Sequence, residues 1–234
     1  MNYMIIDVES TNSLDDPIVY DVGYEVFDDT GQTIACASLT NKDIFLDKEF
    51  MSSAYYAEKI PIYWKQIWAK ERQLLSWKEI KWHIYDVCKR NNCAIVCAHN
   101  ARFDSRALNL TQRYITTSRH RYFMPFGCER WDSLKMAREV LKNDANYNQF
   151  CRYYDYTTKQ GKPRYTAEIL YRFISGDLDF DEAHVGIEDV RIEKEIFLYC
   201  LARKPDIDGR LYKPKPELER KKEPWEIELE ALLA

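Results

Sequence analysis

The sequence lacks several features that mark specialised classes of protein. Its uninterrupted apolar runs are far shorter than the roughly 20 residues that cross a bilayer. Its first residues have no basic region followed by a hydrophobic stretch, the pattern of a secretory signal. It also has no internal repeat and no low-complexity tract. These absences argue against membrane-spanning, secreted and fibrous classes, and we expect a soluble, cytoplasmic protein.

Cysteine pairs at metal-binding spacing are also absent. The seven cysteines are odd in number and scattered, and none forms a C-x-x-C pair. The best grouping for a zinc ion is Cys93, Cys97 and His99, at alternating positions of an apolar, strand-like run. Free cysteine is among the residue types most often buried. We therefore interpret these cysteines as packing residues, with their thiols reduced as in a cytoplasm.

Positive charge is not in excess. The 34 Lys and Arg residues against 38 Asp and Glu residues give a net charge of −4. This balance argues against a protein that coats duplex nucleic acid, because such a protein needs a basic surface. It leaves open an enzyme that grips a few nucleotides through bound cations and local basic residues. The length of 234 residues fits one sizeable α/β domain.

The chain instead has a clear series of strand-like segments. Residues 4–8 form a short apolar run, and two further strand-like segments follow at 18–27 and 33–39. This opening predicts an antiparallel meander of three strands. The apolar segment 93–98 predicts a central strand parallel to the first. A fifth strand is expected around residues 128–131.

Helical periodicity fills most of the remaining sequence. Apolar residues recur at three- and four-residue spacing, as at Ile80, Ile84 and Val87. The segment 52–92, which holds four of the six tryptophans, has a helical pattern. We predict one α/β domain over residues 1–204, with a five-stranded mixed sheet flanked by helices. The expected helices span residues 77–91, 100–114, 133–141, 146–154, 166–175 and 186–202.

The composition changes after Lys204. Four of the eight prolines fall in residues 205–234, with mixed charge and few apolar side chains before Trp225. We predict that this segment is a tail and not part of the core. Its last part could form a short helix and dock on a protein partner, although charged tails are most often solvated. The apolar residues available there are Trp225, Ile227, Leu229, Leu232 and Leu233.

The first candidate site is Asp7-Val8-Glu9, at the end of the first strand. Residues two apart on a strand point to the same face, so the two carboxylates emerge side by side. They repel each other unless a cation intervenes, and clustered carboxylate oxygens suit Mg²⁺ or Mn²⁺. The alternative is an acidic sequence that merely ends a strand in solvent.

The second candidate site is the segment 99–104, His-Asn-Ala-Arg-Phe-Asp. It lies where the central strand gives way to a helix, which is the usual place for ligand contact in α/β sheets. We expect Asn100 to cap this helix and Asp104 to lie one turn later on the same face. The alternative is a capped surface helix whose acid is favoured by the positive end of the helix dipole.

The third candidate site combines His184 and Asp189. They are five positions apart, which would place them on different faces of a helix, so we expect His184 in a loop and Asp189 inside the last helix. Asp189 heads a stripe with Ile192, Ile196 and Cys200, and an acid on a buried stripe needs a partner such as a metal ion. The alternatives are an exposed loop histidine and an ordinary first-turn acid.

The three sites are informative mainly in combination. Each alone is compatible with its alternative. Their order along the chain, on a first strand, a mid-chain helix start and the final helix, predicts that the carboxylates converge at one edge of the sheet. We therefore predict a single metal-dependent site.

With these motifs the sequence resembles the DnaQ-like exonucleases of the DEDDh type, which have a ribonuclease H-like fold. The resemblance extends over residues 3–203. It departs from the family after the first motif, where Ser10-Thr11 stands in place of the frequent Thr-Gly. It also departs at the aromatic stretch 55–68, which replaces an element near the terminal nucleotide. The segments that carry the resemblance are Asp7-Val8-Glu9, 99–104, 131–138 and 183–190.

The resemblance implies a metal-dependent 3′–5′ exonuclease that hydrolyses phosphodiester bonds at a DNA 3′ end, preferably single-stranded, with two Mg²⁺ ions that Mn²⁺ could replace. Asp7, Glu9 and Asp189 would hold one ion, and Asp7 and Asp104 the other. His184 would act as the general base. The implied contacts to the 3′ nucleotide are Ser10, Thr11, Asn100 and Phe103.

Two alternatives to a DNA exonuclease stay open. The same metal site would serve an exoribonuclease or an oligonucleotide nuclease, because the difference lies in contacts to the 2′-OH. A nucleic-acid-binding module on an inactive nuclease fold is the third reading. The complete carboxylate set argues against it, because four clustered acids without a metal carry an electrostatic cost.

Overall fold

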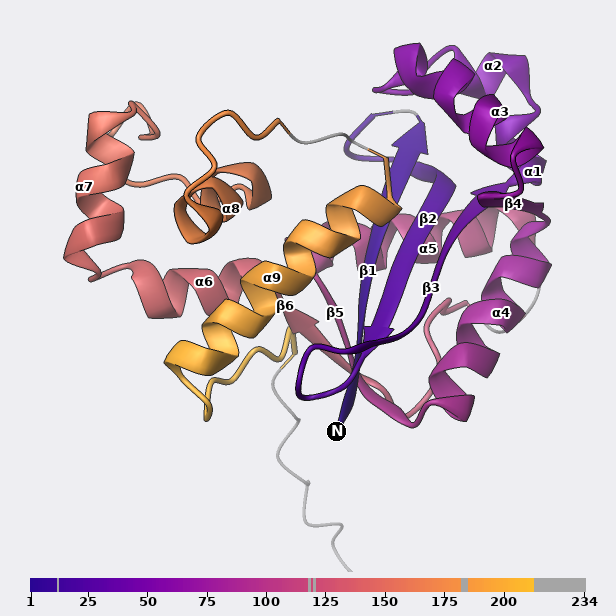
Figure 1. The fold of residues 1–234 in the computed structure, drawn as a ribbon. Coiled ribbons are helices and arrows are strands. Elements are labelled where there is room, and N and C mark those ends of the chain that lie inside the picture. Colours follow the sequence, from indigo (N-terminus) through magenta and orange to yellow (C-terminus); the bar gives the residue numbers. More distant parts are fainter. Residues whose placement is uncertain (12, 118, 120, 182–184, 213–234) are drawn as a thin grey trace, which may run out of the picture.

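A computed structural model of the chain describes residues 1–11, 13–117, 119, 121–181 and 185–212. Its centre is a six-stranded sheet in the order β4-β3-β2-β1-β5-β6 (Figure 1). β1, β2 and β3 pair antiparallel, whereas β4, β5 and β6 join in parallel. The predicted mixed α/β sheet is therefore confirmed. The strands are β1 Asn2–Thr11, β2 Ile18–Phe27, β3 Thr33–Asn41, β4 Arg72–Leu75, β5 Cys93–Ala98 and β6 Glu129–Asp132.

The sheet has one strand more than the five predicted. The additional strand, β4, lies inside the segment 52–92, whose sequence pattern indicated helix. Its four residues are too few to show the alternation of a strand, and it pairs in parallel with β3 at the edge of the sheet. Its conformation therefore depends on the neighbouring strand and not on a local pattern.

Helices cover both faces of this sheet (Figure 1). α4 and α5 lie on one side, which we term the α4–α5 face, and α6 to α9 lie on the other, which we term the α9 face. The predicted helices are present, and none of their ends is shifted by more than one residue. The helices are α1 Lys42–Phe45, α2 Lys48–Met51, a 3₁₀ turn Ala57–Lys59, α3 Ile60–Trp68, α4 Trp77–Arg90, α5 Ala101–Ile115, α6 Ser133–Leu141, α7 Ala145–Tyr153, α8 Ala167–Ser175 and α9 Ile187–Arg203.

The alternation of β1 decides which face carries the acidic residues. Met4, Ile6 and Val8 are buried in the core cluster of the α4–α5 face, whereas Ile5 is buried in the cluster of the α9 face. Because side chains two apart share a face, Asp7 and Glu9 continue the line of Ile5. Both carboxylates therefore leave the strand toward α9.

The aromatic segment that departs from the family pattern builds a third, smaller core cluster. α1, α2 and α3 pack around the first half of β2, with Tyr20, Phe45 and Tyr63 at its centre. The ring centroids of Tyr20 and Tyr63 are 5.7 Å apart, and those of Phe45 and Tyr63 are also 5.7 Å apart. This cluster closes the end of the sheet where β1 delivers its carboxylates.

The chain beyond α9 stays in contact with the domain as far as it is described. Ile207 is buried, the Asp132 N–H donates to the Gly209 carbonyl at 2.8 Å, and the Leu211 N–H donates to the Arg130 carbonyl at 2.7 Å. The division of the chain at residue 204 stays a prediction, and residues 213–234 lie outside the described part. None of the described helices is both long and apolar enough to cross a membrane.

Candidate metal centre

Three of the predicted acids meet at the end of β1. One carboxylate oxygen each of Asp7, Glu9 and Asp189 lies within 4.8 Å of the others. Asp7 and Glu9 come from β1, and Asp189 comes from the first turn of α9. Asp189 is buried, and Asp7 and Glu9 are half-buried. Residues 182 positions apart in the chain thus form one oxygen-rich cluster.

Two glycines allow α9 to approach the sheet this closely. Gly23 is the β2 partner of Asp7, and a Cβ atom placed on it would lie only 2.4 Å from the carbonyl carbon of Gly186, the residue that caps α9. A Cβ atom on Gly186 would lie 2.7 Å from Asp21 Oδ2. Any side chain at either position would push α9 away from β2. The glycine pair therefore places Asp189 beside Asp7.

A bulge shapes the end of the strand pair at the same place. Glu9 pairs with Asp21 but Ser10 pairs with Val19, so Tyr20 is an extra residue on β2. Bulges of this kind increase the local twist and often occur next to active sites, where they change the direction of a side chain. Here the bulge follows Glu9 directly.

Asp104 contributes the fourth predicted acid. It lies in the first turn of α5 and is 4% exposed. Burial raises the pKa of Asp104 to about 8, the Asp132 carboxylate acts in the same direction, and hydrogen bonds from the N–H groups of Asp104 and Val8 act against them. The bond from Val8 ties α5 to β1 between the two strand carboxylates.

The charges that act on Asp7 are those of other carboxylates. Burial raises the pKa of Asp7 well above its usual range, and Glu193, Glu9, Asp104 and Asp189 raise it further, in that order. Ionising all of these groups together is therefore costly in the protein alone. A divalent cation among them would remove that cost.

Glu193 is a fifth acid of this cluster that the sequence reasoning missed. It lies on α9 one turn after Asp189 and is 4% exposed. Its Oε2 accepts a hydrogen bond of 3.1 Å from the backbone N–H of His99, at the junction of β5 and α5. The available signal was its position four residues after Asp189, on the same buried side of the helix.

The junction between β5 and α5 differs from the expected cap. Asn100 precedes α5 in a left-handed conformation with φ of 66°, and its side chain makes no capping hydrogen bond. Its backbone N–H donates to Asp132 Oδ1 at 3.1 Å. Asparagine tolerates positive φ better than most residues, so it serves the turn through its backbone, and the predicted side-chain cap was wrong.

The histidine of the same motif, His99, has a hydrogen-bond partner at each ring nitrogen and so has a structural role. His99 Nδ1 lies 3.0 Å from Ser133 Oγ, and Nε2 lies 2.8 Å from the Tyr165 carbonyl oxygen. Burial lowers the pKa of His99, which favours the neutral ring. Cys93 and Cys97 pack into the core clusters of opposite faces of the sheet.

The predicted nucleotide contacts lie near the cluster in different settings. Ser10 is half-buried and Asn100 is exposed. Thr11 is fully buried, and its hydroxyl donates to the Ile18 carbonyl at 3.2 Å. Phe103 is half-buried against the core of the α4–α5 face. His184, the predicted general base, lies outside the described residues. The substrate contacts and the base therefore stay predictions.

The donor set fits a divalent cation. Carboxylate oxygens are the ligands that Mg²⁺ and Mn²⁺ prefer, and three of them converge here from two elements that the glycine pair holds together. Asp104 adds a fourth carboxylate that acts on Asp7. Among the acids, histidines and cysteines of the described residues, Asp7, Glu9 and Asp189 are the group close enough together to hold a metal ion.

Comparisons with known proteins find solved structures with a similar fold. No family model matches the chain, and no curated protein matches its sequence. Exonuclease I from Methylocaldum szegediense superimposes with a TM-score of 0.56 at 17% identity, covering 88% of this chain and 41% of that one. Exonuclease I from E. coli, in complex with a dA16 oligonucleotide, superimposes with a TM-score of 0.54 at 12% identity. The match covers 87% of this chain and 41% of that one.

These exonucleases are longer proteins, and the chain spans about two fifths of their length. At such low identities the likeness concerns the fold. It agrees with the six-stranded mixed sheet and with the helices on its two faces. The chain therefore has the predicted ribonuclease H-like fold and shares it with these exonucleases.

Proposed function

We propose that the chain is a metal-dependent 3′–5′ exonuclease that hydrolyses phosphodiester bonds at the 3′ end of single-stranded DNA. The observation that carries this proposal is the meeting of Asp7, Glu9 and Asp189 within 4.8 Å, with Asp104 beside them. The fold supports it, because solved structures with this fold are exonucleases, one of them bound to a DNA oligonucleotide.

The protein side of the mechanism follows from the positions of the acids. Asp7, Glu9 and Asp189 would hold one divalent cation, and Asp7 with Asp104 would hold another. Two Mg²⁺ ions, or Mn²⁺ in their place, would supply the positive charge that stabilises the attacking and leaving oxygens of an in-line displacement. His184, outside the described residues, would accept the proton of the attacking water, because a histidine pKa lies near neutral pH.

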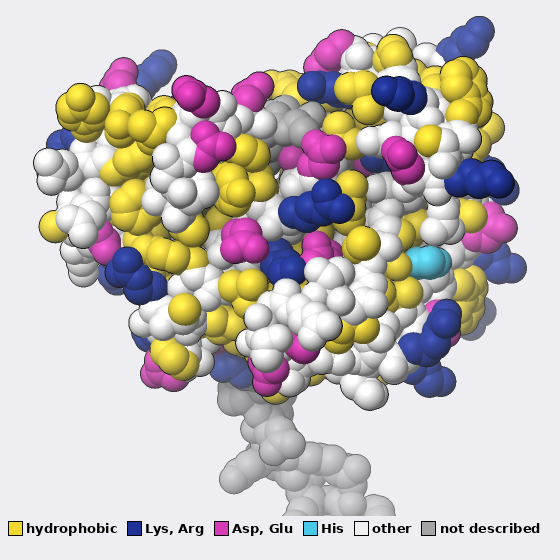
Figure 2. Space-filling model, viewed as in Figure 1, with side chains coloured by type: hydrophobic (Ala, Val, Ile, Leu, Met, Phe, Trp, Pro, Cys, Tyr) yellow, Lys and Arg dark blue, Asp and Glu magenta, His cyan; other side chains and the backbone are white. Residues whose placement is uncertain are grey.

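The substrate part of the proposal rests on local contacts. Asn100 is exposed at the start of α5, and Phe103 lies in the first turn of that helix beside Arg106, whose guanidinium is 6.0 Å from the ring centroid. On the face shown in Figure 2, basic and acidic side chains are interspersed, and apolar ones gather over α7 and α8. A single strand gripped at its end needs few such contacts.

A digest of 5′-labelled single-stranded DNA, duplex DNA and RNA, with Mg²⁺ and with EDTA, tests this function. We expect a ladder that shortens from the 3′ end of single-stranded DNA with Mg²⁺ and no cleavage with EDTA. Asp7→Asn and Asp189→Asn should abolish the ladder, because each removes a carboxylate of the cluster. Asp86→Asn is the matched control, because Asp86 pairs with Arg90 on the surface of α4.

Three outcomes would contradict the proposal in different ways. Undiminished cleavage by the Asp7 variant would remove the metal centre from the mechanism. Faster cleavage of RNA than of DNA would assign the site to an exoribonuclease. No Mg²⁺-dependent cleavage of any substrate by the folded protein would favour a binding module on this fold.

A further inference from the structure

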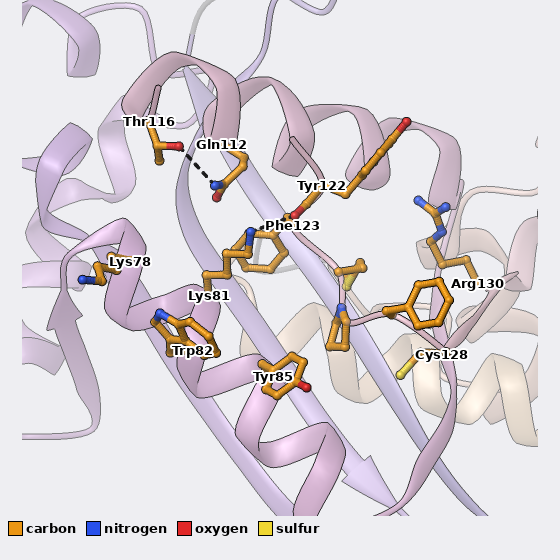
Figure 3. Close-up of a pocket in the computed structure, with 14 residues that line it drawn as sticks. Lys78, Lys81, Trp82, Tyr85, Gln112, Thr116, Tyr122, Phe123, Cys128 and Arg130 are labelled. Carbon is orange, nitrogen blue, oxygen red and sulfur yellow. Dashed lines mark hydrogen bonds between the residues drawn. The ribbon is translucent and has the colours of Figure 1, made fainter. Parts of the chain in front are cut away.

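A groove lies on the α4–α5 face of the sheet, away from the carboxylates. It is formed by α4, by Gln112 and Thr116 at the end of α5, and by residues 122–128 with Arg130, which lead into β6. It has a volume of about 920 Å³. Figure 3 shows Trp82 and Tyr85 projecting from α4, with Phe123 between α4 and α5. Because Asp7 points to the α9 face, the groove is distinct from the metal centre.

Large apolar side chains are exposed around this groove. Trp82 is 58% exposed, Tyr122 is 65% exposed and Phe126 is fully exposed. Tyr85 continues the same surface, with its ring centroid 5.6 Å from that of Trp82. Single exposed apolar residues are ordinary, but aromatic side chains gathered around a concave surface mark a binding site.

The walls of the groove are held in place by the protein itself. Lys81 Nζ donates to the Tyr122 carbonyl at 2.8 Å and so joins α4 to the opposite wall (Figure 3). The Phe123 ring packs on Trp77, with the two ring centroids 4.7 Å apart. The Phe123 N–H donates to Asn109 Oδ1 at 2.9 Å. A groove built in this way is formed before its occupant binds, which lowers the cost of binding.

The charged side chains that line the groove have one sign. Lys78, Lys81 and Arg130 line it, and the described residues that form its wall include no Asp or Glu. This local excess stands against a net charge of −4 for the whole chain. Complementary potential favours an occupant that is both apolar and acidic.

The last described residues of the chain lie next to the groove. The Leu211 N–H donates to the Arg130 carbonyl at 2.7 Å, and the Arg130 guanidinium lies 4.8 Å from the ring centroid of Tyr212. Leu211 also packs on the core cluster beneath the groove. Twelve residues, 213–224, separate Tyr212 from Trp225. At roughly 3.3–3.6 Å per residue they reach up to about 40 Å.

We propose that residues 225–233 of the same chain bind in this groove. The segment alternates apolar residues with Glu226, Glu228 and Glu230, and it has no Lys or Arg. Its apolar side chains would cover the exposed aromatic rings, and its carboxylates would face the cations of the groove, Lys81 among them. The short connection raises the local concentration of the segment at the groove. This proposal is independent of the proposed nuclease function.

Photo-crosslinking in the full-length chain tests this assignment. A benzoyl-phenylalanine is placed at position 225 in place of Trp225, the dilute protein is irradiated, and the attachment site is mapped by mass spectrometry. We expect a monomeric product with attachment within 78–85 or 122–130. Denatured chain is irradiated in parallel as the reference for nonspecific attachment.

Three variants define the chemistry of the contact. Lys81→Glu should reduce the crosslink at least about ten-fold, and adding Glu228→Lys to that variant should restore it in large part, because the charge pair is reversed. Lys81 also holds the wall of the groove, so Trp82→Ala is tested separately and should reduce the crosslink as well. Lys89→Glu, on α4 outside the groove, is the matched control and should leave it unchanged.

Each alternative occupant gives a result that overturns the proposal. A dimeric product alone would place the segment of a second copy in the groove. Attachment outside the groove, or none above the denatured reference, would remove residues 225–233 from it. If no crosslink forms and a dT16 oligonucleotide quenches the fluorescence of Trp82, the groove would be a binding site for nucleic acid.

Discussion

Two acidic centres lie on neighbouring strands of the sheet and are built in opposite ways. Asp7 and Glu9 stand on β1, and Asp21 stands on β2 as the partner of Glu9 in the strand register. Burial raises the pKa of both Asp7 and Asp21. The charges that act on Asp7 raise its pKa further, whereas Arg72 acts to lower that of Asp21.

The Asp21 centre is neutralised by the chain itself. Arg72 and Asp21 form an ion pair whose side chains are both fully buried. Tyr63 donates to Asp21 Oδ2 at 3.1 Å, and Thr40 Oγ1 lies 3.5 Å from Oδ1. The guanidinium lies 4.1 Å from the ring centroid of Tyr63, and its Nε donates to Gln66 at 2.9 Å. These contacts fasten α3 and β4 to β2, so this centre is structural.

The comparison separates two uses of the same residue type. Where the fold supplies an internal cation, a buried aspartate connects elements of structure. Where the fold gathers further carboxylates, the cation must come from solvent, and the site can bind a metal. Because Asp21 is the strand partner of Glu9, the Asp21 centre supports the strand that carries the metal centre.

Removing the internal cation should produce the largest effect on stability. Arg72→Met keeps the volume of the side chain but leaves Asp21 buried without its cation, which should cost roughly 3–5 kcal/mol of unfolding free energy. Urea denaturation followed by circular dichroism measures this loss. The double variant Asp21→Asn/Arg72→Met removes both charges and should recover a large part of it. Equal losses in the single and double variants would contradict the role of charge.

The sequence predicted the elements whose patterns are local. β1, α6 and the buried stripe of α9 follow from apolar runs and helical spacing, and Ile192, Ile196 and Cys200 are buried as expected. β4 could not be predicted, because its four residues become a strand by pairing with β3 and through the contact of Arg72 with Asp21. Such contacts between distant segments leave no periodic signal.

The candidate site also combines features that a local pattern predicts with features that depend on distant contacts. Asp7, Glu9 and Asp189 could be named from strand alternation, helix position and family motifs, and the structure brings them together. The reason that they meet, the close approach of Gly23 and Gly186, depends on two residues far apart in sequence. Glu193 was missed because a glutamate on a helix is ordinarily exposed, and its burial depends on the neighbouring junction at His99.

Loss of the cation from the metal centre should make stability depend on pH. The folded-state pKa of Asp104, about 8, lies above its ordinary value of 3.8. The resulting contribution to stability is present below about pH 3.8 and is lost as pH rises through 8. In EDTA, the unfolding free energy should therefore fall from pH 5 to pH 8, by on the order of 2–4 kcal/mol from this group. Asp104→Asn should show a smaller fall.

Mg²⁺ should oppose this loss where the carboxylates are ionised. Adding 100 times the dissociation constant of a site stabilises a protein by about 2.7 kcal/mol, and we expect the gain at pH 8 to exceed the gain at pH 5. Asp189→Asn should reduce the gain at pH 8, since it removes one oxygen donor of the cluster. Identical pH profiles for the wild type and Asp104→Asn would contradict the cost assigned to this buried acid.

The smallest effect should come from Glu193, which belongs to the acidic cluster by position but is bonded to the framework. Its Oε2 accepts the His99 N–H at 3.1 Å and so joins α9 to the start of α5. If this bond positions Asp104 relative to Asp189, Glu193→Ala should lower the cleavage rate by about ten-fold, the worth of one hydrogen bond. Glu195→Ala, at an exposed position of the same helix, is the control.

The amide variant distinguishes positioning from metal binding. Glu193→Gln keeps an oxygen that can accept the His99 N–H but removes the charge. A positioning residue predicts that Gln restores the rate to within about three-fold of the wild type, with the same Mg²⁺ concentration at half-maximal activity. A residue that holds a cation predicts a higher Mg²⁺ requirement for Gln and Ala alike. That outcome would mean that Glu193 binds the metal ion and does not have a structural role like that of Asp21.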